Sequence, residues 1–152
     1  MSSPSLPGDI EDFDFQIEKE EWNTYELKDG VKLKGRIIIL RLLMDKNAAP
    51  GQYGIQSQNI FVPYAPQNMK GIPRTPPPQN EIKQSDMYPV EVENSNEVWN
   101  VYRIPKTGDR IKVKLVATEV LRVKDVFDQS GQPYYIITSG LMVTPVSKGI
   151  SS

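Results

Sequence analysis

The chain carries one pattern twice, and this internal repeat constrains its fold more than any other feature. Trp22-Asn23-Thr24-Tyr25 returns as Trp99-Asn100-Val101-Tyr102. Further along, Ile60-Phe61-Val62 matches Leu141-Met142-Val143, with short gaps that fall at turns. Matches in the same order over about sixty residues indicate a duplication in which each copy is one supersecondary unit.

The duplication divides the chain into four segments. We expect a disordered tail over residues 1–11, a first β repeat over residues 12–72, a proline-rich linker over residues 73–86 and a second β repeat over residues 87–150. Prolines favour an extended polyproline conformation and cannot donate the hydrogen bonds of a strand ladder. The linker therefore fits a spacer better than a docking peptide for an aromatic groove, which is the alternative.

Both copies have the patterning of β-strands. Alternation of apolar and polar residues predicts a strand within residues 9–21, followed by strands at 22–27, 31–44, 52–58 and 60–64, with a bulge near Ile37–Leu40. Five short strands per copy predict an all-β fold of two small barrel-like halves, of the OB or SH3 kind, related by a pseudo-twofold axis. We favour two packed halves that share an interface, because about sixty residues bury little core alone. The alternative is one unit that exchanges strands between the copies.

The chain contains neither cysteine nor histidine. Zinc sites built from those ligands, Ser-His-Asp triads and Cys-His pairs are therefore excluded. The acidic residues near the N-terminus match no calcium loop. We expect no metal, no cofactor and no catalytic residue. A hydrolase that uses carboxylates ranks third among the functions, since distant carboxylates can meet in a fold.

The apolar segments are too short for a membrane span. The longest run, Ile37–Leu40, is followed by Arg41, far short of the roughly twenty residues that a bilayer requires. The N-terminus also lacks the basic start and apolar stretch of a secretory signal. We therefore expect a cytoplasmic protein without membrane insertion.

The aromatic residues of the repeated blocks are Trp22, Tyr25, Trp99 and Tyr102. Residues three apart on a strand point to opposite faces, so one aromatic of each block is expected in the core and the other at the surface or an interface. The alternative is that each tryptophan fills the core of its own half. Because aromatic side chains contribute most at interfaces, we predict a non-catalytic structural or adaptor module. It would bind a protein partner, or copies of itself, through these residues or through exposed strand edges.

The second-ranked function is single-stranded nucleic-acid binding. Cations at alternate positions of one strand share a face of the sheet, and tyrosines nearby in the repeat order would supply stacking, as in the grooves of OB-type binders. The residues are Lys32, Lys34, Arg36 and Tyr53 in the first copy, and Arg110, Lys112, Lys114 and Tyr135 in the second. The formal net charge of −1 and the neighbouring acidic strands argue against this function.

Overall fold

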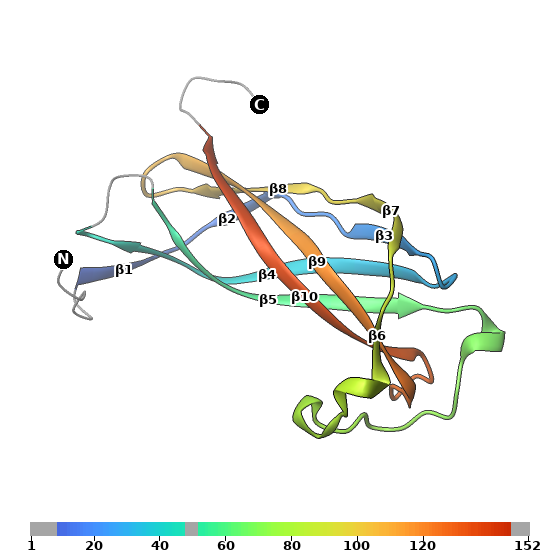
Figure 1. Cartoon of the computed structure of the whole chain (residues 1–152). Coiled ribbons are helices and arrows are strands. Elements are labelled where there is room, and N and C mark those ends of the chain that lie inside the picture. The colour runs from blue at the N-terminus through green and yellow to red at the C-terminus, as the bar shows by residue number, and fades with distance from the viewer. Residues whose placement is uncertain (1–8, 48–51, 147–152) are drawn as a thin grey trace.

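The computed structural model describes residues 9–47 and 52–146 as two antiparallel sheets of five strands each (Figure 1). Sheet A consists of β1 (Ile10–Phe13), β3 (Asn23–Leu27), β4 (Lys32–Asp45), β5 (Gly54–Tyr64) and β7 (Val92–Asn96). Sheet B consists of β2 (Gln16–Lys19), β6 (Met87–Pro89), β8 (Trp99–Ile104), β9 (Asp109–Phe127) and β10 (Pro133–Val146). The described residues contain no α-helix, and three 3₁₀ turns lie between β5 and β6: Gln67–Met69, Gln79–Glu81 and Gln84–Asp86. The predicted all-β class is confirmed.

The two sheets follow the same pairing plan. In sheet A, β4 pairs with β5 on one side and with both β3 and β1 on the other, and β7 lies beyond β3. In sheet B, β9 pairs with β10 on one side and with both β8 and β6 on the other, and β2 lies beyond β8. In the part of the chain described, neither sheet closes on itself, so the predicted OB-like or SH3-like barrels are not confirmed.

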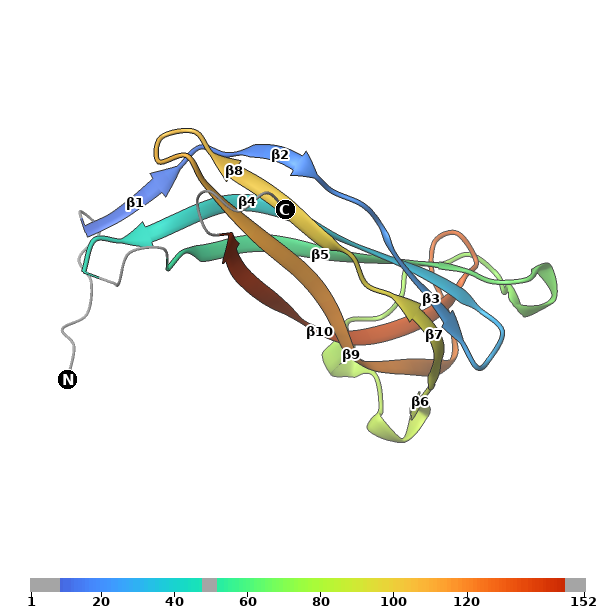
Figure 2. The same cartoon turned by 90° about the horizontal axis from the view of Figure 1, so that it is seen from above.

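Two short strands cross from one sheet to the other. β2 directly follows β1 along the chain but pairs with β8, and β7 directly follows β6 but pairs with β3 (Figure 2). The crossings take place in the two-residue links Asp14-Phe15 and Val90-Glu91. This arrangement corresponds to the strand-exchanged alternative and differs from the separately packed halves that we favoured.

The core lies between the sheets and has two parts, each built from both. One part packs Ile37 and Leu42 of β4 against Tyr102 of β8 and Ile111 of β9. The other packs residues of the β3–β4 hairpin, including Leu33, against Val120 of β9, with Tyr135 and Ile137 alongside. Because each part requires strands of both sheets, neither sheet has a hydrophobic core without the other.

Several strand boundaries differ from the predicted ones. β5 is one continuous strand instead of two, and the segment 9–21 forms two strands because the chain changes sheets at Asp14-Phe15. β1 begins at Ile10, inside the predicted tail. Residues 1–8, 48–51 and 147–150 of the predicted tail, turn and second repeat lie outside the described residues. The predicted bulge is confirmed, since the register between β4 and β5 shifts between Ile39 and Arg41.

The start of the linker and the residues just before it are hydrogen-bonded to the turn between β9 and β10. Gly71 N–H donates to the Gly131 carbonyl at 2.9 Å, and Arg74 N–H donates to the Asp128 carbonyl at 3.0 Å. Gly131 adopts φ +77°, a conformation that favours glycine. The first part of the proline-rich segment is thus fixed on its own chain.

Gly35 of β4 allows two aromatic rings to approach the sheet. A Cβ at this position would lie 2.7 Å from Cε1 of Phe61 and 3.3 Å from Cε2 of Tyr25. Gly35→Ala is therefore expected to lower the free energy of unfolding by about 1–3 kcal/mol, the usual cost of overpacking. Urea denaturation measures it, with Gly140→Ala as the control, since a Cβ there meets nothing within 4 Å. Equal urea midpoints for the two variants would contradict the prediction.

Candidate functional site

The structure separates the aromatic residues of the repeated blocks into two kinds. Tyr25 and Tyr102 are buried, with 2% and 0% of their surface exposed. Trp22 is 38% exposed and Trp99 is half-buried. Tryptophan and tyrosine point to opposite faces, as strand geometry requires. Of the four predicted partner-binding residues, the two tyrosines are buried and the two tryptophans lie at the surface.

The buried tyrosines join the two sheets through glutamates. The Tyr25 hydroxyl donates to Glu97 Oε2 at 2.8 Å, and the Tyr102 hydroxyl donates to Glu20 Oε2 at 2.9 Å. Burial, and then the hydrogen bond to the carboxylate, raise the pKa of both tyrosines well above the ordinary value. The two contacts are reciprocal, because each glutamate precedes the Trp-Asn-x-Tyr block of the opposite sheet.

The asparagines of the same blocks make a second reciprocal pair. Asn23 Oδ1 accepts from the Val98 N–H at 2.8 Å, and Asn100 Oδ1 accepts from the Glu21 N–H at 3.0 Å. Asn23 Nδ2 also donates to the Leu115 carbonyl at 2.8 Å. Both asparagines are 2% exposed. Their bonds fix the links between β2 and β3 and between β7 and β8, where the chain changes sheets again; we call these two links the crossing segments.

Tyr53 and Tyr135, predicted to stack on bases, instead bind aspartates. The Tyr53 hydroxyl donates to Asp109 at 2.9 Å, and the Tyr135 hydroxyl donates to Asp29 at 2.6 Å. Burial is the first cause that raises the pKa of each tyrosine. Both rings pack against the core, so they do not form an exposed stacking surface.

The six predicted nucleic-acid-binding cations lie on two different surfaces. We define the outer face of each sheet as the side away from the core. The cations of β4, Lys32, Lys34 and Arg36, alternate with buried residues and occupy the outer face of sheet A. Those of β9, Arg110, Lys112 and Lys114, occupy the outer face of sheet B. Because the sheets are stacked, these faces point in opposite directions and the six cations cannot line one groove.

Carboxylates lie beside two of the three cations in the row on sheet A, and aromatic rings lie beside two of them. Arg36 forms an ion pair with Glu20 and lies over the Trp22 ring, 5.5 Å from its centroid. Lys34 lies over the ring of Tyr64 at 5.3 Å. Lys32 is directly opposite Glu26 in the pairing of β3 with β4. On this sheet the charges are largely compensated within the chain.

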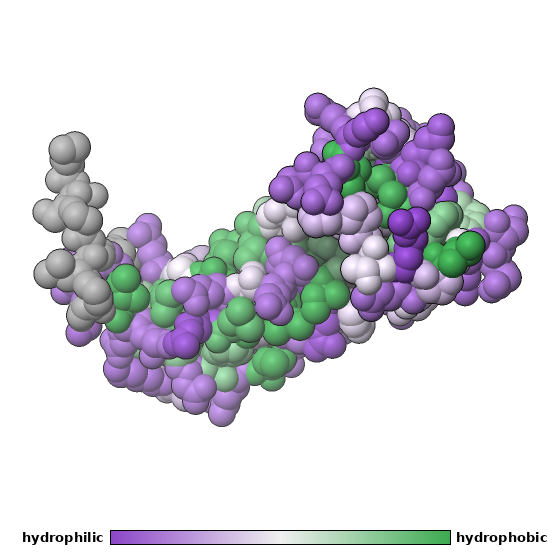
Figure 3. Space-filling model, turned by 90° about the horizontal axis from the view of Figure 1, so that it is seen from below, coloured by the Kyte–Doolittle hydropathy of each residue, from purple (hydrophilic) through white to green (hydrophobic). Residues whose placement is uncertain are grey.

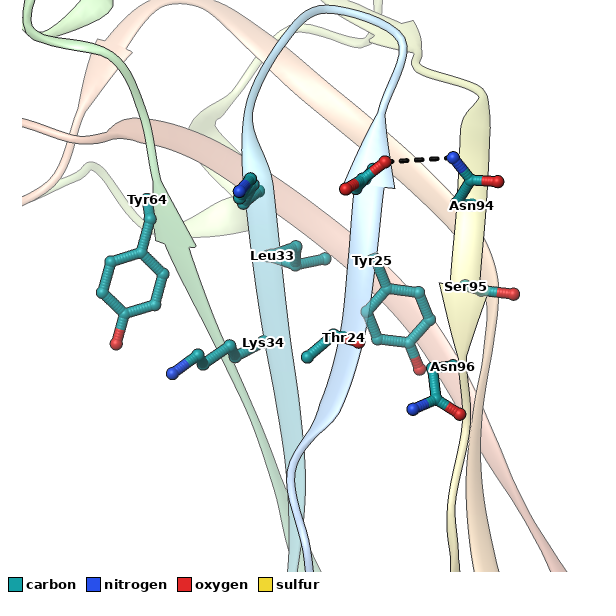
Figure 4. A pocket seen from close by; sticks show the side chains of 10 residues that line it. Thr24, Tyr25, Leu33, Lys34, Tyr64, Asn94, Ser95 and Asn96 are labelled. Carbon is teal, nitrogen blue, oxygen red and sulfur yellow. Dashed lines mark hydrogen bonds between the residues drawn. The ribbon is translucent and has the colours of Figure 1, made fainter.

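A shallow groove of about 550 Å³ crosses the outer face of sheet A (Figure 4). Tyr64 of β5 forms one side, Asn94 and Asn96 of β7 form the other, and Thr24 and Lys34 lie between them. Asn94 donates a hydrogen bond to Glu26 at 3.0 Å. Tyr25 and Tyr64, two asparagines and the charged residues Glu26, Lys32 and Lys34 line the groove, which thus offers rings, amides and both signs of charge to a ligand.

The long strands β5 and β10 present free edges. In the described residues each pairs on one side only, β5 with β4 and β10 with β9. β5 has 11 residues and β10 has 14, and none of these residues is charged. The strands come together where Asn59 Nδ2 donates to Ser139 Oγ at 3.2 Å. Figure 3, seen from below Figure 1, shows apolar side chains along the middle of the molecule.

Sequence reasoning missed Glu20 and Glu97. Each lies two residues before the tryptophan of its block, so the repeat reads Glu-x-Trp-Asn-x-Tyr in both copies. The signal was present in the alignment of the two copies. Alternation alone could not reveal it, because both glutamates lie in links between strands and act on the opposite sheet.

Within residues 9–47 and 52–146, no group of three or more acidic side chains could hold a metal ion. In the same ranges, no helix has the length and apolar character needed to cross a membrane. No protein-family model, curated protein or solved structure matches the chain.

Proposed function

We propose that the protein is a non-catalytic structural module that assembles with copies of itself through the free edge of β10. The observation that supports this proposal is the absence of charge along the long free edges. An exposed edge presents unpaired N–H and C=O groups, and proteins usually protect such edges with lysines, prolines, bulges or covering loops.

The prolines of β10 lie near its ends, and its pairing with β9 has one register shift in the middle, between Thr138 and Ser139. Pro133 begins the strand and Pro145 lies one residue before its end, which leaves the stretch between them able to pair. Val143 lies opposite the buried Val113 and is 42% exposed, although it shares the inner side of the sheet. Met142 on the outer side is 51% exposed. A second strand beside β10 would cover both side chains.

Pairing of β10 with β10 of a second copy would produce a closed dimer. Antiparallel strands related by a twofold axis present the same surface to each other, so the contact is isologous. Each β10 edge is then paired with the other, and no third copy can add to it. No like charges oppose each other, because the strand has none. Trp22, on the outer face of sheet A, remains a candidate contact for a different protein partner.

Sedimentation velocity over a concentration series tests this proposal. The native protein is expected to form a dimer of the 17.2 kDa chain whose stability does not depend on salt. Met142→Lys is expected to give a monomer, because pairing would bring a lysine of each copy into the uncharged contact. Thr24→Lys is the control, since it adds the same charge to an exposed site on β3, a strand that is paired on both sides.

A native protein that remains monomeric at every concentration would refute the proposal. A dimer that survives Met142→Lys but dissociates in Thr24→Lys would move the contact to the groove of sheet A. Circular dichroism of both variants establishes that they are folded.

A further inference from the structure

We infer that the outer face of sheet B is a binding surface for single-stranded nucleic acid. The inference concerns a different surface from the β10 edge and does not rest on self-assembly. We define the basic face as five cations on β2, β8 and β9 that the strand register places on this side of the sheet: Lys19, Arg103, Arg110, Lys112 and Lys114.

The register brings like charges together on the basic face. Arg103 of β8 lies directly opposite Arg110 of β9, and Lys112 follows on the same face of β9. Lys19 of β2 lies opposite Val101, which in turn lies opposite Lys112. Like charges directly across two strands are destabilising, so folding stability alone does not account for this arrangement.

Sheet A provides the comparison within the same chain. The position of Arg110 corresponds there to Lys32, and the residue opposite Lys32 is Glu26, a carboxylate. At this position of the repeat, sheet A thus has opposite charges across its strands, and sheet B has like charges. A carboxylate, Glu26, occupies the opposing strand position in sheet A, whereas a cation, Arg103, occupies it on the basic face.

Few carboxylates reach the basic face. Glu18 binds Arg110, with 2.7 Å between Nε and Oε1. Among the described residues, Arg103, Lys112 and Lys19 form no ion pair, and Lys114 lies over the Trp99 ring at 4.8 Å from its centroid. Five cations, of which one is ion-paired, give a locally positive surface on a chain whose net charge is −1. An anionic partner would remove the repulsion between these cations.

The geometry of the basic face favours a polyanion with regularly spaced charges. Side chains on one face of a strand recur about every 6.8 Å, so Arg110, Lys112 and Lys114 form an evenly spaced row along β9. Phosphates follow each other regularly along a nucleic-acid strand, and an arginine fork can bind one phosphate through two hydrogen bonds. Trp99 at the end of the row adds an aromatic ring beside which a base can stack. An acidic protein segment would use the cations but would gain less from the ring.

Fluorescence anisotropy with a labelled, mixed-sequence single-stranded DNA of about 12 nucleotides tests the inference. With about four phosphates neutralised, affinity is expected to fall roughly 50-fold between about 50 and 200 mM salt. Arg103→Glu is expected to lower the affinity about tenfold or more at low salt. This variant should fold, because a glutamate opposite Arg110 reproduces the arrangement of Glu26 and Lys32 in sheet A.

Lys32→Glu is the matched control. It changes the net charge by the same amount on the outer face of sheet A, and its affinity is expected to stay within about twofold of the native value. An equal loss in both variants would show a non-specific charge effect and overturn the inference. Absence of binding at low salt would overturn it as well. Displacement of the DNA by a polyglutamate peptide of equal charge, at equal concentration, would assign the surface to acidic proteins instead.

Discussion

Asn23→Leu is expected to lower the free energy of unfolding by about 4 kcal/mol. Leucine is similar in size but cannot form the hydrogen bonds that Asn23 makes with the Val98 N–H and the Leu115 carbonyl. Both backbone groups would stay in the interior without a partner, at a cost of about 1–3 kcal/mol each. Urea denaturation followed by circular dichroism measures the loss, which is a large part of the roughly 5–15 kcal/mol that stabilises a typical domain.

Two controls separate the interior bonds from a general effect of leucine. Asn94→Leu changes an exposed asparagine on β7 and is expected to alter stability by no more than about 0.5 kcal/mol. Asn100→Leu removes the bond to the Glu21 N–H on the other crossing segment and is expected to cost about 1–3 kcal/mol. If Asn23→Leu proved as mild as Asn94→Leu, the crossing segments would not depend on these bonds.

The strands and their faces could be predicted from the sequence because burial follows alternation. In β4, Leu33 and Ile37 point inward while Lys34 points outward, and the break in this pattern predicted the bulge beside Leu40. The opposite orientations of Trp22 and Tyr25 follow from the same geometry. These properties are local, so each copy of the repeat specifies them independently.

The partners of the strands could not be predicted in this way. β2 and β7 are exposed along their whole length, and nothing in the sequence period tells which sheet accepts them. Each short strand joins the opposite sheet after a two-residue link, and its position depends on contacts such as Tyr102 with Glu20, 82 residues apart. For the same reason the sequence predicts Tyr53 and Tyr135 as stacking residues, although their hydroxyl groups bind aspartates 56 and 106 residues away.

The candidate surfaces were only partly visible in the sequence. The cations of β9 were identified, but Arg103 and Lys19 were not, because their place on the basic face depends on cross-strand register. The difference between Glu26 and Arg103 was present in the repeat alignment. The cross-strand register adds that Glu26 faces Lys32 and Arg103 faces Arg110, so the difference is one between opposite and like charges.

Stability is expected to fall steeply above pH 10. Burial and the bonds to Glu97 and Glu20 raise the pKa of Tyr25 and Tyr102 in the folded state above the value of about 10 found in unfolded chains. As the pH rises past 10, the unfolded chain loses these protons first, which favours unfolding. The contribution of each tyrosine is therefore complete below pH 10 and is lost as the pH rises towards the folded pKa. The two together should cost about 3 kcal/mol of stability by pH 11.

Urea denaturation at pH 8, 10 and 11, with tyrosinate absorbance recorded in parallel, tests this expectation. Stability is expected to change little near neutral pH, since the chain has no histidine. The double variant Tyr25→Phe, Tyr102→Phe should start from a lower stability at pH 8 and lose about 3 kcal/mol less by pH 11. Tyr53 and Tyr135, whose pKa values are raised in the same direction, account for a remaining slope in that variant. If the native protein lost stability no faster than the double variant, the phenol–carboxylate pairs would not link the sheets as the structure indicates.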